Sequence, residues 1–113
     1  MSLESKTVRA MTDLKATRSR KRAPTHPGVF LDEEILPKVS LNKTEIAEKL
    51  GISRQTLYDI LKGNAQVTPE MAVRFGKMFG NGPLLWINMQ RNYDLWHAER
   101  NVDTKNIPTL RVA

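Results

Sequence analysis

Apolar residues recur at steps of three and four along residues 28–100, the spacing of helices that bury one face. Residues 1–25 show no such recurrence, and the last eight residues, NIPTLRVA, alternate apolar and polar positions as a short strand or an extended tail would. The expected helices cover residues 28–36, 43–50, 54–62, 69–79 and 84–100. The pattern therefore predicts an all-α domain of five helices.

Helix boundaries are marked by residues that favour them. Asn42, with Glu45 three residues on, has the spacing of a capping box, and Ser53 can cap the next helix. Thr68 followed by Pro69 is a typical helix opening, because proline needs no hydrogen-bond acceptor in the first turn. Pro37 is expected to end the first helix. Glycines follow the second, third and fourth helices, where the chain must often adopt a left-handed conformation.

The second and third helices meet the sequence requirements of a helix-turn-helix, which would span about residues 43–62. Ala47 supplies a small residue where two steeply crossing helices approach, and Gly51, four residues later, can adopt positive φ at the turn. The positions that must then face inward are all apolar: Ile46, Leu50, Ile52, Leu57 and Ile60. This segment predicts a DNA-binding unit whose third helix enters the major groove.

With Leu57 and Ile60 inward, the outer face and first turn of the third helix carry polar groups that suit DNA. Arg54 can make a paired contact with guanine and Gln55 with adenine, and Thr56 can meet a thymine methyl group or a phosphate. Lys43, at the start of the second helix, is expected to contact phosphate. Asp59 is expected to be a solvated residue unless it accepts from cytosine. The candidate DNA-binding residues are Lys43, Ser53, Arg54, Gln55, Thr56, Tyr58, Asp59 and Lys62.

The charge of the chain is concentrated near its N-terminus. The net charge is +6, and residues 1–26 contain seven Lys and Arg against Glu4 and Asp13, whereas residues 27–100 contain nine of each sign. We expect a flexible basic arm (1–25), a DNA-binding domain (26–100) and a C-terminal tail (101–113). Within the arm, the candidate phosphate contacts are Arg18, Arg20, Lys21 and Arg22. The alternative is that the arm only improves solubility.

Several classes of function are disfavoured. The chain has no cysteine, and its two histidines, His26 and His97, lie at opposite ends of the domain, so neither a metal site nor a cofactor site is expected. The sequence contains no nucleophile–base pair and no phosphate-binding loop, so neither an enzyme nor a small-molecule substrate is expected. No apolar run is long enough to span a membrane, and no secretion signal precedes the domain, which favours a cytoplasmic protein.

The fifth helix carries more aromatic surface than a small domain needs to close its core. We expect part of this surface to be shared with a second copy of the chain in a homodimer, since Tyr and Trp favour interfaces. The expected interface residues follow one another at three- and four-residue steps: Trp86, Met89, Tyr93 and Trp96.

Three segments together resemble the HigA-type antitoxins of the XRE, or lambda-repressor-like, class. They are THPGVFLDEEIL, LNKTEIAEKLGISRQTLYDILKGNAQVTPEMAVRFGKMFG and WINMQRNYDLWHAERNVD, which cover residues 25 to about 105. The resemblance implies a lambda-repressor-like fold and binding of operator DNA as a dimer. It also implies repression of the chain's own operon and neutralisation of a HigB- or RelE-like toxin that cleaves mRNA. The long basic arm departs from the family pattern.

The resemblance leaves the toxin-binding face open. An RNA-binding toxin is basic, so its antitoxin should present an acidic or apolar surface. Asp32, Glu33 and Glu34 on the first helix are the favoured face, and we expect this helix to lie away from the DNA. The alternative face is the end of the fifth helix, with Asp94 and Glu99. Two other functions remain open: a stand-alone XRE-type repressor without a toxin partner, and a toxin-binding protein whose helix-turn-helix is only structural.

Overall fold

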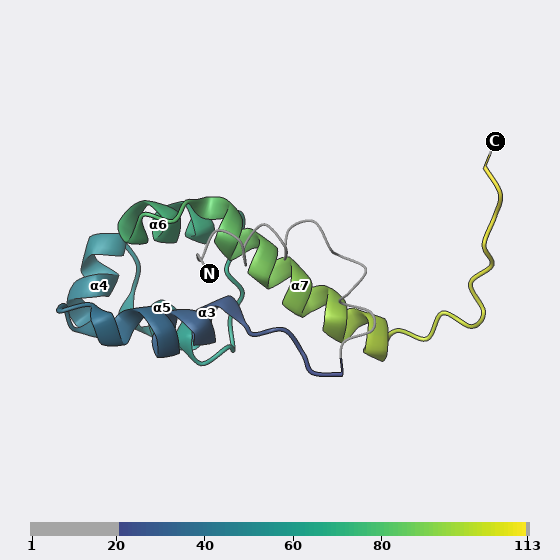
Figure 1. The fold of residues 1–113 in the computed structure, drawn as a ribbon, viewed down its shortest axis with the longest axis horizontal. Helices are drawn as coiled ribbons and strands as arrows, with labels where there is room; N and C mark the ends of the chain where they lie inside the picture. Colours follow the sequence, from purple (N-terminus) through teal and green to yellow (C-terminus); the bar gives the residue numbers. More distant parts are fainter. Residues whose placement is uncertain (1–20, 113) are drawn as a thin grey trace, which may run out of the picture.

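The computed structural model describes residues 21–112, and this part of the chain is all-α, with five α-helices and no strand. The helices are α3 (Pro27–Phe30), α4 (Lys43–Leu50), α5 (Arg54–Leu61), α6 (Pro69–Phe79) and α7 (Pro83–Asn101). Figure 1 shows α4 and α5 at one end of the molecule and the long α7 running diagonally toward the other end, where the C-terminal tail leaves. The predicted fold class is confirmed.

The first helix differs from the expected uniform α-helix. After α3 the chain continues as a π-helix (Leu31–Ile35), in which the Leu36 N–H bonds to the Leu31 carbonyl, and then as a 3-10 turn (Leu36–Lys38). Pro37 has no N–H to donate to the preceding turn, so the helix ends one residue beyond it.

The predicted caps are confirmed. Asn42 Oδ1 accepts from the Glu45 N–H at 2.9 Å, and Glu45 Oε1 accepts from the Asn42 N–H at 3.2 Å. Thr68 Oγ1 accepts from the Met71 N–H at 3.2 Å, with Pro69 at the first position of α6. Gly51 adopts positive φ after α4, as the turn requires. These bonds satisfy donors that the first turn of a helix leaves without partners.

The core lies where all five helices meet, and it is centred on aromatic rings. Trp86 is fully buried; its indole lies 5.2 Å from the Phe75 ring and 6.1 Å from those of Phe30 and Phe79, and its Nε1 donates to Asn81 Oδ1. The buried apolar residues are Leu31, Ile46, Ala47, Leu50, Leu57, Ile60, Leu61, Val67, Ala72, Phe75 and Trp86.

This packing corrects the expected dimer interface. Trp86 belongs to the core of its own domain, so it presents no surface to a second copy. Met89, Tyr93 and Trp96 are half-buried, and Tyr93 lies edge-on to His26 at 5.0 Å. The exposed large apolar residues of α7 are Leu84 and Leu95, on a different stripe of the helix.

Two glycines permit helices to approach each other at backbone distance. A Cβ on Gly28 would overlap the Ile60 carbonyl, where α3 packs on α5. A Cβ on Gly76 would overlap the backbone of Gly82 and Pro83, where α6 meets the start of α7. Any larger residue at either position would force the helices apart.

Beyond α7, residues 102–112 form an extended tail rather than a strand. Figure 1 shows it leaving the far end of α7 and running away from the domain. No helix within residues 21–112 combines the length and the apolar character needed to cross a bilayer.

His26 is a buried structural residue. Its Nδ1 accepts from the Gly28 N–H at 2.9 Å and so caps α3, and the side chain is 5% exposed. Burial lowers the pKa of His26 below 6.5, although nearby Asp94 and a hydrogen bond to the Ala65 backbone oppose the shift. A proton on Nδ1 would also remove the acceptor that caps the helix.

The first prediction concerns pH. Because the pKa of His26 is lower in the folded chain, the unfolded chain binds the proton first, and stability falls as pH drops below about 6.5. One such group contributes at most about 1.4 kcal/mol per pH unit. In His26→Asn the side chain still caps the helix and cannot titrate, so urea unfolding between pH 7.5 and 5.5 should show a smaller loss than in the native chain. Equal losses would contradict this role of His26.

Candidate nucleic-acid interface

Helices α4 and α5 form the corner of a helix-turn-helix. Ala47 is buried where they approach, and the Ile52 N–H bonds to the Ala47 carbonyl at 3.0 Å across the turn. Gly51 makes this turn with φ of 77°. The predicted inward residues on α4 and α5 are all buried, and Ile52 is half-buried. The corner therefore has the geometry that the sequence predicts.

The N-terminus of α5 is fixed by Ser53. Its Oγ accepts from the Thr56 N–H at 3.0 Å and donates to Thr56 Oγ1 at 2.8 Å. Ser53 and Thr56, two of the candidate DNA-binding residues, are therefore engaged in capping the helix. Arg54 and Gln55, which lie between them, are exposed, as are Tyr58 on the same helix and Lys62 directly after its end.

Gln55 is held in one orientation by Asp59. Gln55 Nε2 donates to Asp59 Oδ1 at 2.9 Å, one turn along α5. Because a carboxylate only accepts hydrogen bonds, the amide must direct its nitrogen toward Asp59. The second N–H and the Oε1 atom of Gln55 are left for a partner outside the helix. In the major groove adenine presents an acceptor, N7, and a donor, the N6 amino group, which match this N–H and Oε1.

Lys43 is placed by contacts from two other elements. Its Nζ lies 3.5 Å from Asp32 Oδ1 and 5.5 Å from the centre of the Tyr58 ring. Asp32 lies in the π-helix and Tyr58 on α5, so Lys43 of α4 contacts both the first helix and an exposed side chain of α5. That the acidic first helix lies away from the DNA stays a prediction, although its Asp32 forms an ion pair with a candidate DNA-binding residue. Glu33 and Glu34 are exposed.

Arg74 is a positioning residue that the sequence analysis missed. Its Nη1 donates to the Leu50 carbonyl at 2.6 Å, at the end of α4, and its Nη2 donates to Glu70 Oε1 at 3.1 Å. The spacing of Glu70 and Arg74 indicates a pair within one helix, but no local pattern shows that the guanidinium also reaches another helix. Through it, α6 fixes the end of α4 beside the turn.

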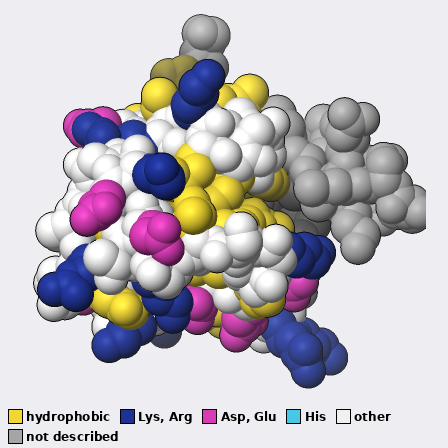
Figure 2. Space-filling model, turned by 90° about the vertical axis from the view of Figure 1, so that its left-hand side faces the viewer, with side chains coloured by type: hydrophobic (Ala, Val, Ile, Leu, Met, Phe, Trp, Pro, Cys, Tyr) yellow, Lys and Arg dark blue, Asp and Glu magenta, His cyan; other side chains and the backbone are white. Residues whose placement is uncertain are grey.

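The surface around this corner carries both signs of charge. Figure 2 views the molecule from the end where Figure 1 shows α4, and Lys and Arg side chains lie around this face with Asp and Glu among them. Of the expected phosphate contacts in the arm, Lys21 and Arg22 are exposed, whereas Arg18 and Arg20 lie outside the described residues.

Comparisons with known proteins agree with this geometry. Residues 34–87 match the model of a helix-turn-helix family. The chain is 39% identical over 80 residues to an uncharacterised HTH-type transcriptional regulator of Haemophilus influenzae, which covers 71% of this chain and 75% of the relative. It is 32% identical over 89 residues to antitoxin HigA-1 of Vibrio cholerae, covering 79% and 78%.

A solved structure of a DNA-binding antitoxin is also similar to this chain. The Pseudomonas aeruginosa antitoxin HigA, solved with the higBA promoter, matches with a TM-score of 0.66 and 27% identity, covering 77% of this chain and 99% of that one. The helix-turn-helix corner, the caps and these similarities lead to one conclusion. The chain belongs to the XRE-type helix-turn-helix family of DNA-binding regulators that includes the HigA antitoxins.

Proposed function

We propose that this chain binds operator DNA as a homodimer through the N-terminal half of α5, represses its own operon and neutralises a RelE-like toxin that cleaves mRNA. One observation carries the DNA-reading role: Arg54 and Gln55 are exposed on a helix whose first turn is capped by Ser53, and Asp59 orients the Gln55 amide. Two copies related by a two-fold axis would read half-sites about one helical turn, or 34 Å, apart.

The antitoxin role is supported by relatives rather than by a site. Similar solved structures include antitoxins with an operator or a promoter. A second candidate function, a stand-alone repressor without a toxin, is favoured by relatives that are named only as uncharacterised transcriptional regulators. The neighbouring gene separates the two functions, since a small basic protein encoded beside this one would favour the antitoxin.

The second prediction concerns base reading. Gln55→Ala should weaken binding to the operator by about 1–3 kcal/mol and relax the preference at one base pair, with little change on random DNA. Asp59→Asn should also relax that preference, because the Gln55 amide can then turn over. It should meanwhile strengthen binding to all DNA, because a negative charge is lost near phosphates.

Fluorescence anisotropy on operator variants and on random DNA measures both effects. Lys105→Ala, which removes a cation from the exposed tail, is the control for a general loss of charge. Equal weakening on operator and random DNA by Gln55→Ala would mean that Gln55 touches the backbone and not a base. An unchanged base-pair preference in Asp59→Asn would contradict the orienting role of the carboxylate.

The third prediction concerns the basic arm, which we propose adds phosphate contacts through Arg18, Arg20, Lys21 and Arg22. Deleting residues 1–22 should weaken binding to every DNA sequence and flatten the plot of log affinity against log salt by about 0.9 per lost contact. Titrations at four salt concentrations measure the slope. A slope equal to that of the full chain would leave the arm without a role in DNA binding.

The fourth prediction concerns the toxin, which we propose docks on the acidic side of the first helix. Because Asp32 pairs with Lys43, a triple charge reversal would disturb the DNA-binding surface as well. The sharper variant is therefore Glu33→Lys with Glu34→Lys, which should abolish rescue of toxin-arrested cells and leave operator binding by the antitoxin alone intact. Asp32→Asn is the matched control and should affect mainly DNA binding. Full rescue by the double variant would contradict docking on the first helix and favour the end of α7, with Asp94 and Glu99.

A further inference from the structure

The C-terminal tail carries large apolar side chains that contribute nothing to the core of their own domain. Ile107, Leu110 and Val112 are 64%, 77% and 92% exposed, on a segment that runs away from the helices (Figure 1). Single exposed apolar residues are ordinary, but here Leu110 and Val112 share one face of the extended chain and form an apolar edge, with Ile107 three residues earlier on the opposite face. Such an edge is suited to a complementary surface.

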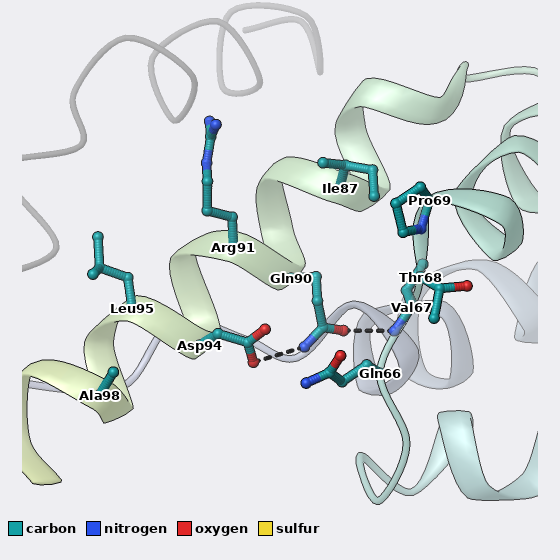
Figure 3. A pocket seen from close by; sticks show the side chains of 10 residues that line it. All are labelled: Gln66, Val67, Thr68, Pro69, Ile87, Gln90, Arg91, Asp94, Leu95 and Ala98. Atoms are coloured by element: carbon teal, nitrogen blue, oxygen red, sulfur yellow. Dashed lines mark hydrogen bonds between the residues drawn. The ribbon is translucent and has the colours of Figure 1, made fainter.

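A complementary groove lies along α7. It has a volume of about 480 Å³ and runs between one stripe of α7 and residues 66–69, which lead into α6. Figure 3 shows Ile87 beside Pro69, and Leu95 and Ala98 further along the helix. Leu95 is 39% exposed although it is a leucine in the middle of a helix. The groove is therefore apolar and open at the half of α7 nearer the tail.

Three polar groups that line the groove are paired with one another. Gln90 Oε1 accepts from the Val67 N–H at 2.8 Å, and Gln90 Nε2 donates to Asp94 Oδ1 at 2.9 Å, as the dashed lines in Figure 3 show. These bonds hold α7 to the 66–69 segment and fix the width of the groove. An apolar occupant can therefore enter without leaving the Gln90 amide or the Val67 N–H unsatisfied.

Tail and groove also agree in length and charge. Ile87 to Ala98 spans about 17 Å of helix, at 1.5 Å per residue. Ile107 to Val112 spans about 17 Å when extended, at 3.3 Å per residue. Arg111 lies between the last two apolar residues of the tail. The groove carries an exposed carboxylate, Asp94, near the tail end of α7, and the one cation among the described residues that line it, Arg91, bonds to Asn88. A tail seated in the groove could therefore bring opposite charges together at its rim.

We propose that the tail of one copy, residues 107–112, seats in the α7 groove of a second copy, and that the exchange is reciprocal. The tail does not fold back on its own helix: the Ile107 N–H bonds to the Thr104 carbonyl at 3.0 Å, and beyond this turn the chain runs away from α7 (Figure 1). Two tails in two grooves form a closed, two-fold arrangement. This inference rests on the homodimer of the proposed function and names its contact surface.

Disulfide trapping tests the exchange, because the chain has no cysteine of its own. A chain with Leu95→Cys is mixed with a chain that carries Leu110→Cys and an N-terminal affinity tag, so that the mixed dimer has its own mass. Mild oxidation should yield mainly this mixed dimer on non-reducing gels. The control replaces Leu95→Cys by Leu84→Cys, which is exposed on α7 but does not line the groove, and should yield at least tenfold less.

A second measurement uses the chain ended after Asn101 and the double variant Ile107→Ser with Leu110→Ser. Sedimentation equilibrium should show dimer dissociation constants raised at least tenfold for both. At concentrations low enough that all the chains are monomeric, the thermal midpoints should agree within a degree or two, because the altered residues lie outside the core. A chain that carries both cysteines and closes on itself at low concentration would overturn exchange between copies.

The outcomes separate this inference from the proposed function. If the shortened chain still dimerises with undiminished affinity and binds a palindromic operator, tail exchange is wrong and the proposed function stands. If the full chain stays monomeric and does not bind the operator, both are wrong. If the tail variants dissociate and lose operator affinity while random DNA is bound as before, both are supported.

Discussion

The indole of Trp86 is the contact on which the arrangement of the helices depends. Its faces and edges meet rings from α3 and α6, so one side chain on α7 joins the first and the fourth helix of the domain to the last. A small domain buries a modest share of its surface, and one large aromatic side chain is then a large part of its core. The helix-turn-helix corner is held against this core by Leu57 and Ile60 on α5.

Outside that core, a close backbone contact fixes the position of α5, and one guanidinium fixes the end of α4. Gly28 lets α3 touch the Ile60 carbonyl, so α5 cannot move outward without breaking this fit. Arg74 holds the last carbonyl of α4 from the opposite side of the turn. Both helices of the corner are therefore fixed from outside the corner, which gives the exposed side chains of Arg54 and Gln55 the rigid support that the proposed reading of bases requires.

Local features of this fold are predictable from sequence, and long-range ones are not. Asn42, Ser53 and Thr68 cap their helices as predicted, because a cap depends only on the next three residues. The prediction for α7 is wrong at Trp86, because apolar residues lie all around this helix and its buried residues also include Asn88, Gln90 and Asn92. The pairing of Asp32 with Lys43 joins two separate helical segments, and no spacing along the chain encodes it.

The π-helix at Leu31–Ile35 has a consequence for how such proteins could diverge. A π-turn holds one residue more than an α-turn, and removing that residue restores an ordinary helix without moving the segments on either side. The acidic side chains of this turn would then follow one another at about 100° around the helix axis, as in an α-helix, instead of at the smaller angle of a π-turn. Deletion of a single codon here would thus change the spacing of charges on the acidic face, while the corner of α4 and α5 keeps its shape.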